Sequence, residues 1–178
     1  LAVENETHAV RGYVGSGAFL DLGRHGPVDM IRAVRSPGST LKPFIYGLAF
    51  DGLVAHPETI IADRPMRFGD YAPRNFDGKF HGEVTAREAL QLSLNLPAVA
   101  LLDRIGPALL ASRFAAAGVE LRLPAGEKRP GLPVALGGVG VTLEDLVRLY
   151  GGLATGGRSY PLRFLPGDRA DSGVPLMS

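Results

Sequence analysis

The stretch RSPGSTLKPF, residues 35–44, joins a glycine turn to the start of an apolar helix. Hydrophobic residues recur at helical spacing from Ser39 to about Leu53 and predict one helix there. Ser39 and Lys42 are three residues apart, so they share a face of this helix, with Cβ atoms about 5–6 Å apart. No Asp or Glu lies three or four residues from Lys42 to hold its charge.

This pair suggests a serine nucleophile with a lysine base. A serine hydroxyl reacts poorly until a base removes its proton, and a lysine can do so only when it is neutral. Its pKa must fall from about 10.4 towards 7, at a cost of about 4 kcal/mol in ammonium solvation. The apolar face that continues through Ile45 and Ala49 can impose that cost by burial. The alternative is that Ser39 only caps the helix and Lys42 is solvated.

A second polar group lies in QLSLNLPAV, residues 91–99. A helix is predicted to start at the capping box of Thr85, with Ser93 on its apolar stripe. Asn95 is expected where this helix ends or kinks before Pro97. Beside Ser39, Ser93 could relay a proton and Asn95 could hold a substrate carbonyl. Alternatively, Ser93 bonds the carbonyl one turn back and Asn95 only terminates the helix.

The rest of the chain mixes short strands and helices. Residues 1–4 and 9–14 predict a hairpin, and residues 97–105 and 107–117 predict helices. A last helix should start at the Thr142 capping box. The stretches at 56–79 and 119–140, and the extended run expected at 28–34, carry weaker patterns. These elements indicate an α+β fold with many helices and an N-terminal β-hairpin.

Composition excludes several classes of function. The 178 residues have 46% hydrophobic and 21% charged content and a net charge of +1, which fits one globular domain or part of one and gives no case for nucleic-acid binding. There is no cysteine, and no apolar stretch reaches the roughly 18 residues of a membrane span. The four histidines are far apart, and the glycines at 138 and 140 lack the third glycine of a dinucleotide loop. We therefore expect no metal and no cofactor.

Three long segments resemble one family. SPGSTLKPF (36–44) is similar to the active-site segment of class A penicillin-binding proteins, whose transpeptidase domains carry S-x-x-K. YAPRNFDGKFHGEVTAREALQLSLNLPAV (71–99) is similar to the family segment that contains S-x-N, and ALGGVGVTLEDLVRLYGGLATGG (135–157) to the helix that follows. The resemblance extends from Ala9 to Leu162. The opening residues, 9–44, are most similar to the penicillin-binding protein 1C subgroup.

The resemblance implies a site and a reaction. Ser39 would be the acylated nucleophile, Lys42 its base, Ser93 the proton shuttle and Asn95 the ligand of the substrate's amide carbonyl. The reaction would be DD-transpeptidation of peptidoglycan stem peptides ending in D-Ala-D-Ala, and β-lactams would trap the same serine. It further implies an extracytoplasmic, periplasmic location and a parent protein with a membrane anchor and a glycosyltransferase domain outside this chain.

The family's third motif, K-T-G, is not in the sequence, since Lys42, Lys79 and Lys128 are its only lysines and none precedes Thr-Gly or Ser-Gly. We therefore expect a partial transpeptidase domain over residues 1–166, lacking the central sheet strands and inactive by itself, followed by a disordered tail at 167–178. Two alternatives remain open. One is a non-catalytic interaction module of the same fold, and the other is a serine β-lactamase or β-lactam sensor.

Overall fold

The computed structural model describes residues 1–168 and 172–177. The chain forms two compact units, each with its own packing. Unit 1 comprises Leu1–Arg35, Ser112–Arg122 and Gly140–Ser178, and unit 2 comprises Ser36–Ala111 and Leu123–Val139. Every candidate site residue predicted from the sequence belongs to unit 2.

Unit 2 is built around helix α1, Lys42–Asp51, which packs against α3, Asn95–Ile105. Short helical segments complete it: the 3₁₀ turns η2 (Gly38–Leu41) and η3 (Leu132–Leu136), and α2 (Ala86–Gln91). Helix α1 is buried on nearly all sides, because Phe44, Ile45 and Leu48 and their neighbours leave it no broad polar face. The predicted helix is confirmed, but its first turn is 3₁₀ and its α-helical part starts at Lys42.

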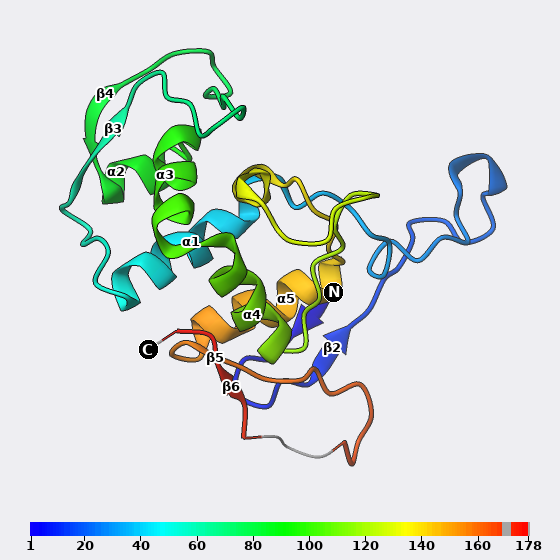
Figure 1. Cartoon of the computed structure of the whole chain (residues 1–178). Coiled ribbons are helices and arrows are strands. Elements are labelled where there is room, and N and C mark those ends of the chain that lie inside the picture. The colour runs from blue at the N-terminus through cyan, green and yellow to red at the C-terminus, as the bar shows by residue number, and fades with distance from the viewer. Residues whose placement is uncertain (169–171, 178) are drawn as a thin grey trace. The chain divides into compact units, whose positions relative to one another are not determined.

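A β-hairpin adjoins these helices in unit 2. Strand β3, Ile60–Asp63, pairs antiparallel with β4, Gly82–Thr85, so that Ile60 lies opposite Thr85 and Asp63 opposite Gly82. The sequence analysis missed β3 inside the loop expected at 56–79, because so short a strand gives little alternating pattern. Residues 64–81 connect the two strands (Figure 1). Side chains of this connection belong to the site described below.

Unit 1 contains the predicted N-terminal hairpin, in which β1 (Ala2–Val3) pairs antiparallel with β2 (Val10–Gly12). Its main helix is α5, Leu143–Ala154, and its other elements are the 3₁₀ turn η1 (Leu22–Arg24) and strands β5 (Arg158–Ser159) and β6 (Val174–Pro175). Helix α4, Pro107–Ala116, is divided between the two units. Residues 28–34 form turns and bends, not the extended run expected from the sequence. The helices and short antiparallel pairs agree with the predicted α+β class.

The C-terminal segment departs from the disordered tail expected at 167–178. Strand β6 pairs with β5, and Leu176 beside it is buried. Residues 169–171 and 178 lie outside the described residues. The domain boundary at residue 166 stays a prediction.

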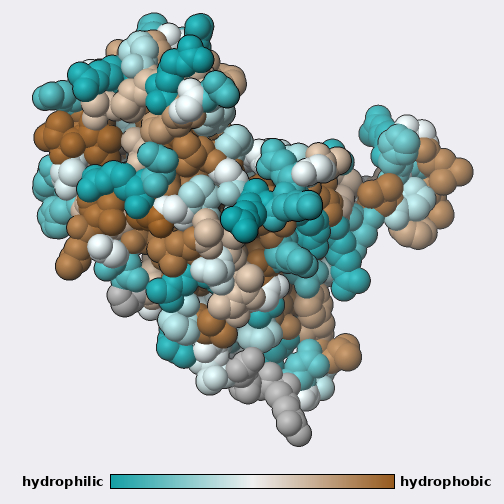
Figure 2. All heavy atoms as spheres, in the orientation of Figure 1, coloured by the Kyte–Doolittle hydropathy of each residue, from teal (hydrophilic) through white to brown (hydrophobic). Residues whose placement is uncertain are grey.

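Exposed hydrophobic side chains gather on one loop of unit 1. Phe19, Leu20 and Leu22 are all exposed, and Figure 2 shows hydrophobic residues on this loop, which is drawn in blue in Figure 1. Ile31, just after the loop, is by contrast fully buried. Among the described residues, no helix is both long enough and apolar enough to span a bilayer.

Candidate active site

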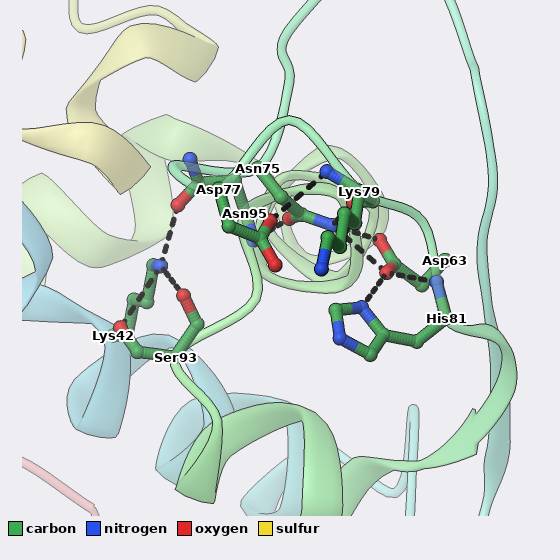
Figure 3. Close-up of polar contacts among 8 residues, drawn as sticks. All are labelled: Lys42, Asp63, Asn75, Asp77, Lys79, His81, Ser93 and Asn95. Carbon is green, nitrogen blue, oxygen red and sulfur yellow. Dashed lines mark hydrogen bonds and ion pairs between the residues drawn. The ribbon is translucent and has the colours of Figure 1, made fainter.

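Lys42 lies at the first position of α1 with only 1% of its surface exposed. Its Nζ donates to the backbone oxygen of Ser93 at 2.5 Å, to Ser93 Oγ at 3.2 Å and to Asn95 Oδ1 at 2.7 Å (Figure 3). All three partners are neutral, and burial lowers the pKa of Lys42 to about 8 from an ordinary value of 10.5. The lysine is therefore held in place without a carboxylate that would keep it protonated.

Tyr46, one turn along α1, does not supply a counter-charge either. Its side chain is buried, and burial, reinforced by the charge of Asp63, raises the pKa of its hydroxyl well above the usual value. The ring stays a neutral phenol at any physiological pH. It adds to the apolar surroundings of α1, which favour the neutral form of Lys42.

Ser39 lies in the 3₁₀ turn η2 and is exposed to solvent. In a 3₁₀ turn side chains three residues apart eclipse one another, so Ser39 and Lys42, which directly follows the turn, project on the same side of the chain. The backbone N–H of Lys42 donates to the Ser39 carbonyl and closes this turn. Within the part of the chain that the structure describes, Nζ bonds Ser93 and Asn95 and does not bond Ser39 Oγ.

The turn that presents Ser39 is fixed from a distant segment. Ser36 Oγ donates to the carbonyl of Gly137 at 2.7 Å. Gly38 and Gly137 both have positive φ, 54° and 86°, and a Cβ on Gly137 would overlap the backbone of Gly38. Glycine is required at residue 137 for both reasons. The SPG turn therefore approaches η3 closely.

Ser93 was predicted inside a helix, and this prediction is wrong. Helix α2 ends at Gln91, and Ser93 follows in the left-handed conformation with φ 53°. Its N–H donates to the Leu90 carbonyl at 3.0 Å and the Leu94 N–H donates to the Ala89 carbonyl at 2.9 Å, which is the Schellman ending of a helix. Glycine usually occupies this position, whereas here a serine presents both its hydroxyl and its carbonyl to Lys42.

Asn95 was expected to end a helix, and instead it begins one. It is the first residue of α3, and Pro97 falls within the first turn, where a missing N–H does no harm. Its Oδ1 accepts from Lys42, while its Nδ2 donates to the Arg74 carbonyl at 2.7 Å. The structure thus brings Lys42, Ser93 and Asn95 together at one point in unit 2.

Polar residues of the β3–β4 connection form hydrogen bonds that link Asn95 to Asp63. Asn75 Oδ1 accepts from the Asn95 backbone N–H at 2.7 Å, and Asn75 Nδ2 donates to both oxygens of Asp63 at 2.8 Å. His81 also contacts Asp63, through its ring Nδ1 at 2.9 Å (Figure 3). The sequence analysis missed these residues, although the turn-forming composition of NFDG, residues 75–78, marked a tight turn there.

A pocket of about 260 Å³ opens beside Ser93 on the same unit. The side chain of Phe76 is fully exposed at this pocket and that of Leu92 largely so. The lining residues are Asn75, Phe76, Asp77, His81, Leu92, Ser93 and Leu94. The described residues contain no group of three His, Cys, Asp or Glu side chains that could hold a metal ion.

A buried lysine between a serine-bearing turn and an S-x-N turn is the arrangement expected of a transpeptidase of the penicillin-binding class. A comparison with protein families gives the same class. Residues 1–172 match the model of the penicillin-binding protein transpeptidase domain. The chain belongs to this family.

Individual relatives agree with the 1C-like resemblance. Over 168 residues the chain is 46% identical to penicillin-binding protein 1C of Escherichia coli. The aligned region covers 94% of this chain and 22% of that protein. It is 34% identical over 138 residues to penicillin-binding protein 1F of Bacillus subtilis, covering 77% of this chain and 18% of that protein. The chain thus spans about a fifth of the length of these relatives.

The fold also matches a solved structure, that of the penicillin-binding protein PonA1 from Mycobacterium tuberculosis. The TM-score is 0.70 at 20% identity, over 84% of this chain and 45% of that one. This similarity establishes a partial transpeptidase fold.

Proposed function

We propose that this chain is the part of a peptidoglycan DD-transpeptidase that carries the nucleophile, its base and the S-x-N turn. The observation that supports it best is the environment of Lys42, which is buried, bonded to neutral acceptors and placed one 3₁₀ turn from an exposed serine. A lysine that only stabilised the fold would be expected to have a carboxylate partner, because burying an unpaired ammonium costs free energy. The same cost favours the neutral amine, which is the form that a base needs.

In the proposed acylation, neutral Lys42 takes the proton of Ser39 as Oγ attacks the carbonyl of the penultimate D-Ala. The tetrahedral intermediate collapses, the bond to the terminal D-Ala breaks, and an ester joins the donor stem to Ser39. The leaving amine receives its proton from Ser93, which is re-protonated by Lys42 across the 3.2 Å contact between Nζ and Oγ. Attack by an amine of a neighbouring stem then forms the cross-link and frees Ser39.

Asn95 binds the amide carbonyl of the stem peptide in this proposal. An amide nitrogen carries two N–H donors, and one of those on Asn95 is used by the Arg74 carbonyl. The second can donate to a substrate carbonyl while Oδ1 still accepts from Lys42. Asn95 can therefore hold the base and the substrate at the same time.

The remaining functional assignments depend on the family and on the longer relatives. We place the reaction on the extracytoplasmic, periplasmic face of the membrane, in a protein that also has an anchor and a glycosyltransferase domain. Since the sequence has no K-T-G, the complete reaction requires residues beyond these 178, and the chain alone is expected to be inactive. In the family, β-lactams acylate the same serine, so they serve as probes of it.

Labelling of the complete gene product with a fluorescent penicillin tests the proposal. We expect one covalent adduct, located by peptide mass mapping at Ser39 and lost in Ser39→Ala. Ser16→Ala, in unit 1, is the matched control and should be labelled like the unchanged protein. Absence of labelling in the complete protein would favour a non-catalytic module, and rapid hydrolytic release of the label would favour a β-lactamase.

A further inference from the structure

We infer that Asn75, held by the buried carboxylate of Asp63, is a positioning residue that aims Asn95 at Lys42. The inference rests on the proposed function, because it assigns Asn75 a part in acylation through the proposed base. Asn75 bonds neither Lys42 nor Ser39, so it is not a catalytic residue. Its effect passes through Asn95 (Figure 3).

The anchor of this arrangement is Asp63 at the end of β3. Its side chain is fully buried. A buried carboxylate is costly unless several donors surround it. Asn75 Nδ2 donates to both of its oxygens at 2.8 Å, and His81 approaches Oδ2 through its backbone N–H at 2.8 Å and ring Nδ1 at 2.9 Å.

These contacts fix which way the Asn75 amide points. Its Nδ2 faces Asp63 and also donates to the Lys79 carbonyl at 2.8 Å, so both of its N–H groups have acceptors. Rotating the amide by 180° would set its oxygen against a carboxylate and a carbonyl, and that arrangement is repulsive. The oxygen must therefore face the other way, towards the Asn95 N–H.

The start of α3 needs such an acceptor. The residue before it, Leu94, has no side chain that could cap the helix, and the first N–H groups of a helix lack partners within it. Asn75 fills this role from a segment far away in the sequence. The adjacent Arg74 carbonyl takes the side-chain N–H of Asn95 at 2.7 Å, so both ends of that residue are held.

The consequence is an Asn95 amide with a defined orientation. With Nδ2 committed to Arg74 and the backbone N–H committed to Asn75, Oδ1 lies 2.7 Å from Nζ of Lys42. If Asn75 served only to join the β3–β4 connection to α3, its effect on acylation would not depend on Asn95 Oδ1. If Asn75 is a positioning residue, its effect on acylation requires that oxygen, and this difference separates the two roles.

The experiment measures the second-order rate of acylation by a fluorescent penicillin in the complete protein, together with thermal unfolding. Asn75→Ala should lower the rate about 10- to 100-fold, as expected for misplacing a reacting group by about 1 Å. In an Asn95→Ala background the same substitution should lower it no further, because the oxygen through which it acts is gone. Equal fold losses in both backgrounds, or an unchanged rate in Asn75→Ala, would overturn the inference.

Asp145→Asn, in unit 1, is the matched control. The Asp145 carboxylate accepts the Thr142 N–H in a capping box and pairs with Arg122, so loss of its charge should lower the unfolding temperature while leaving acylation unchanged. A loss of acylation in this variant equal to that in Asn75→Ala would assign both effects to stability and overturn the inference.

An exchange of the two side chains guards against simple misfolding. Asn75→Asp alone sets two carboxylates against each other and should lower the acylation rate at least as much as Asn75→Ala. Adding Asp63→Asn restores a donor–acceptor pair with the roles reversed and keeps an oxygen for the Asn95 N–H. Part of the rate should therefore return, although the Lys79 carbonyl still lacks its donor. No recovery in a folded double variant would overturn the inference.

Two outcomes separate the inference from the proposed function. A complete protein that the penicillin does not label at all would overturn both, whereas normal labelling of Asn75→Ala would overturn the inference alone.

Discussion

Four helices of this molecule, α1, α2, α3 and α5, start in two different ways. Helices α2 and α5 each begin after a threonine that forms a complete capping box, Thr85 with Glu88 and Thr142 with Asp145. Helices α1 and α3 begin after leucines, Leu41 and Leu94, and neither leucine can offer a side-chain cap. No candidate site residue lies at the start of a self-capped helix, although Ser93 follows the end of α2, while Lys42 and Asn95 are the first residues of α1 and α3.

The difference shows what an uncapped helix start makes available. N–H groups that no local side chain satisfies can bind partners from elsewhere, and the helix dipole favours negative charge there. At α3 the N–H of Asn95 is taken by Asn75 from another segment. At α1 the preceding 3₁₀ turn presents Ser39 instead. Helix starts without local caps are thus where unit 2 assembles its site.

Replacing the base should have the largest effect. Lys42→Met keeps a long apolar side chain in the buried position but removes the amine, so acylation by a fluorescent penicillin should slow about 10²- to 10⁴-fold. Stopped-flow or gel-based labelling measures the rate. Lys128→Met, at an exposed lysine, is the control and should acylate normally. A Lys42→Met protein that acylates as fast as the unchanged one would remove Lys42 from the mechanism.

The pH dependence of acylation should follow the deprotonation of Lys42. Its pKa is lowered to about 8 by burial, so the neutral fraction rises about tenfold per pH unit below 8 and levels off above it. The acylation rate should rise in the same way between pH 6 and 8. NMR titration of ε-¹³C-labelled lysine in the complete protein gives the pKa directly, with the Lys42 signal identified by its loss in Lys42→Met. A rate that still rises tenfold per unit above pH 9 would contradict a lowered pKa.

Ser93 allows the backbone and the hydroxyl to be separated. A non-glycine residue in the left-handed conformation costs about 1–2 kcal/mol, and Ser93 has a φ of 53°. Ser93→Gly should therefore be more stable to denaturant than Ser93→Ala by about 1 kcal/mol. Both variants lack the hydroxyl, so both should acylate equally slowly. A faster glycine variant would show that the strained backbone, and not the hydroxyl, limits the reaction.

Local signals in the sequence predicted much of this fold. Both capping boxes were recognisable from the spacing of Thr85 and Thr142 to the acids three residues on, and both are confirmed. The burial of Lys42 without a charged partner also followed from the apolar residues of its own helix. In each case the residues that decide the structure lie within about one helical turn of each other.

The errors arose where distant residues decide the structure. Ser93 was placed inside a helix, because a serine in the position that usually holds glycine gives no stop signal. Asn95 was expected to end a helix, because its partner Asn75 belongs to a remote loop. Asp63 was missed together with β3, whose pairing with β4 depends on a long connection. Nonlocal hydrogen bonds thus hold much of the candidate site together, and a single sequence does not display them.

The smallest predicted effect concerns the two self-capped helices. Thr85→Ala and Thr142→Ala should each lower the free energy of unfolding by about 1 kcal/mol, because each removes the acceptor for an N–H in the first turn of its helix. Neither threonine bonds Lys42 or Asn95, so acylation of the folded protein should be unchanged. Chemical denaturation and penicillin labelling of the same samples measure both quantities. If either variant lost as much acylation rate as Asn75→Ala, the locally capped helices would also hold the site, and the division between the two kinds of helix start would not stand.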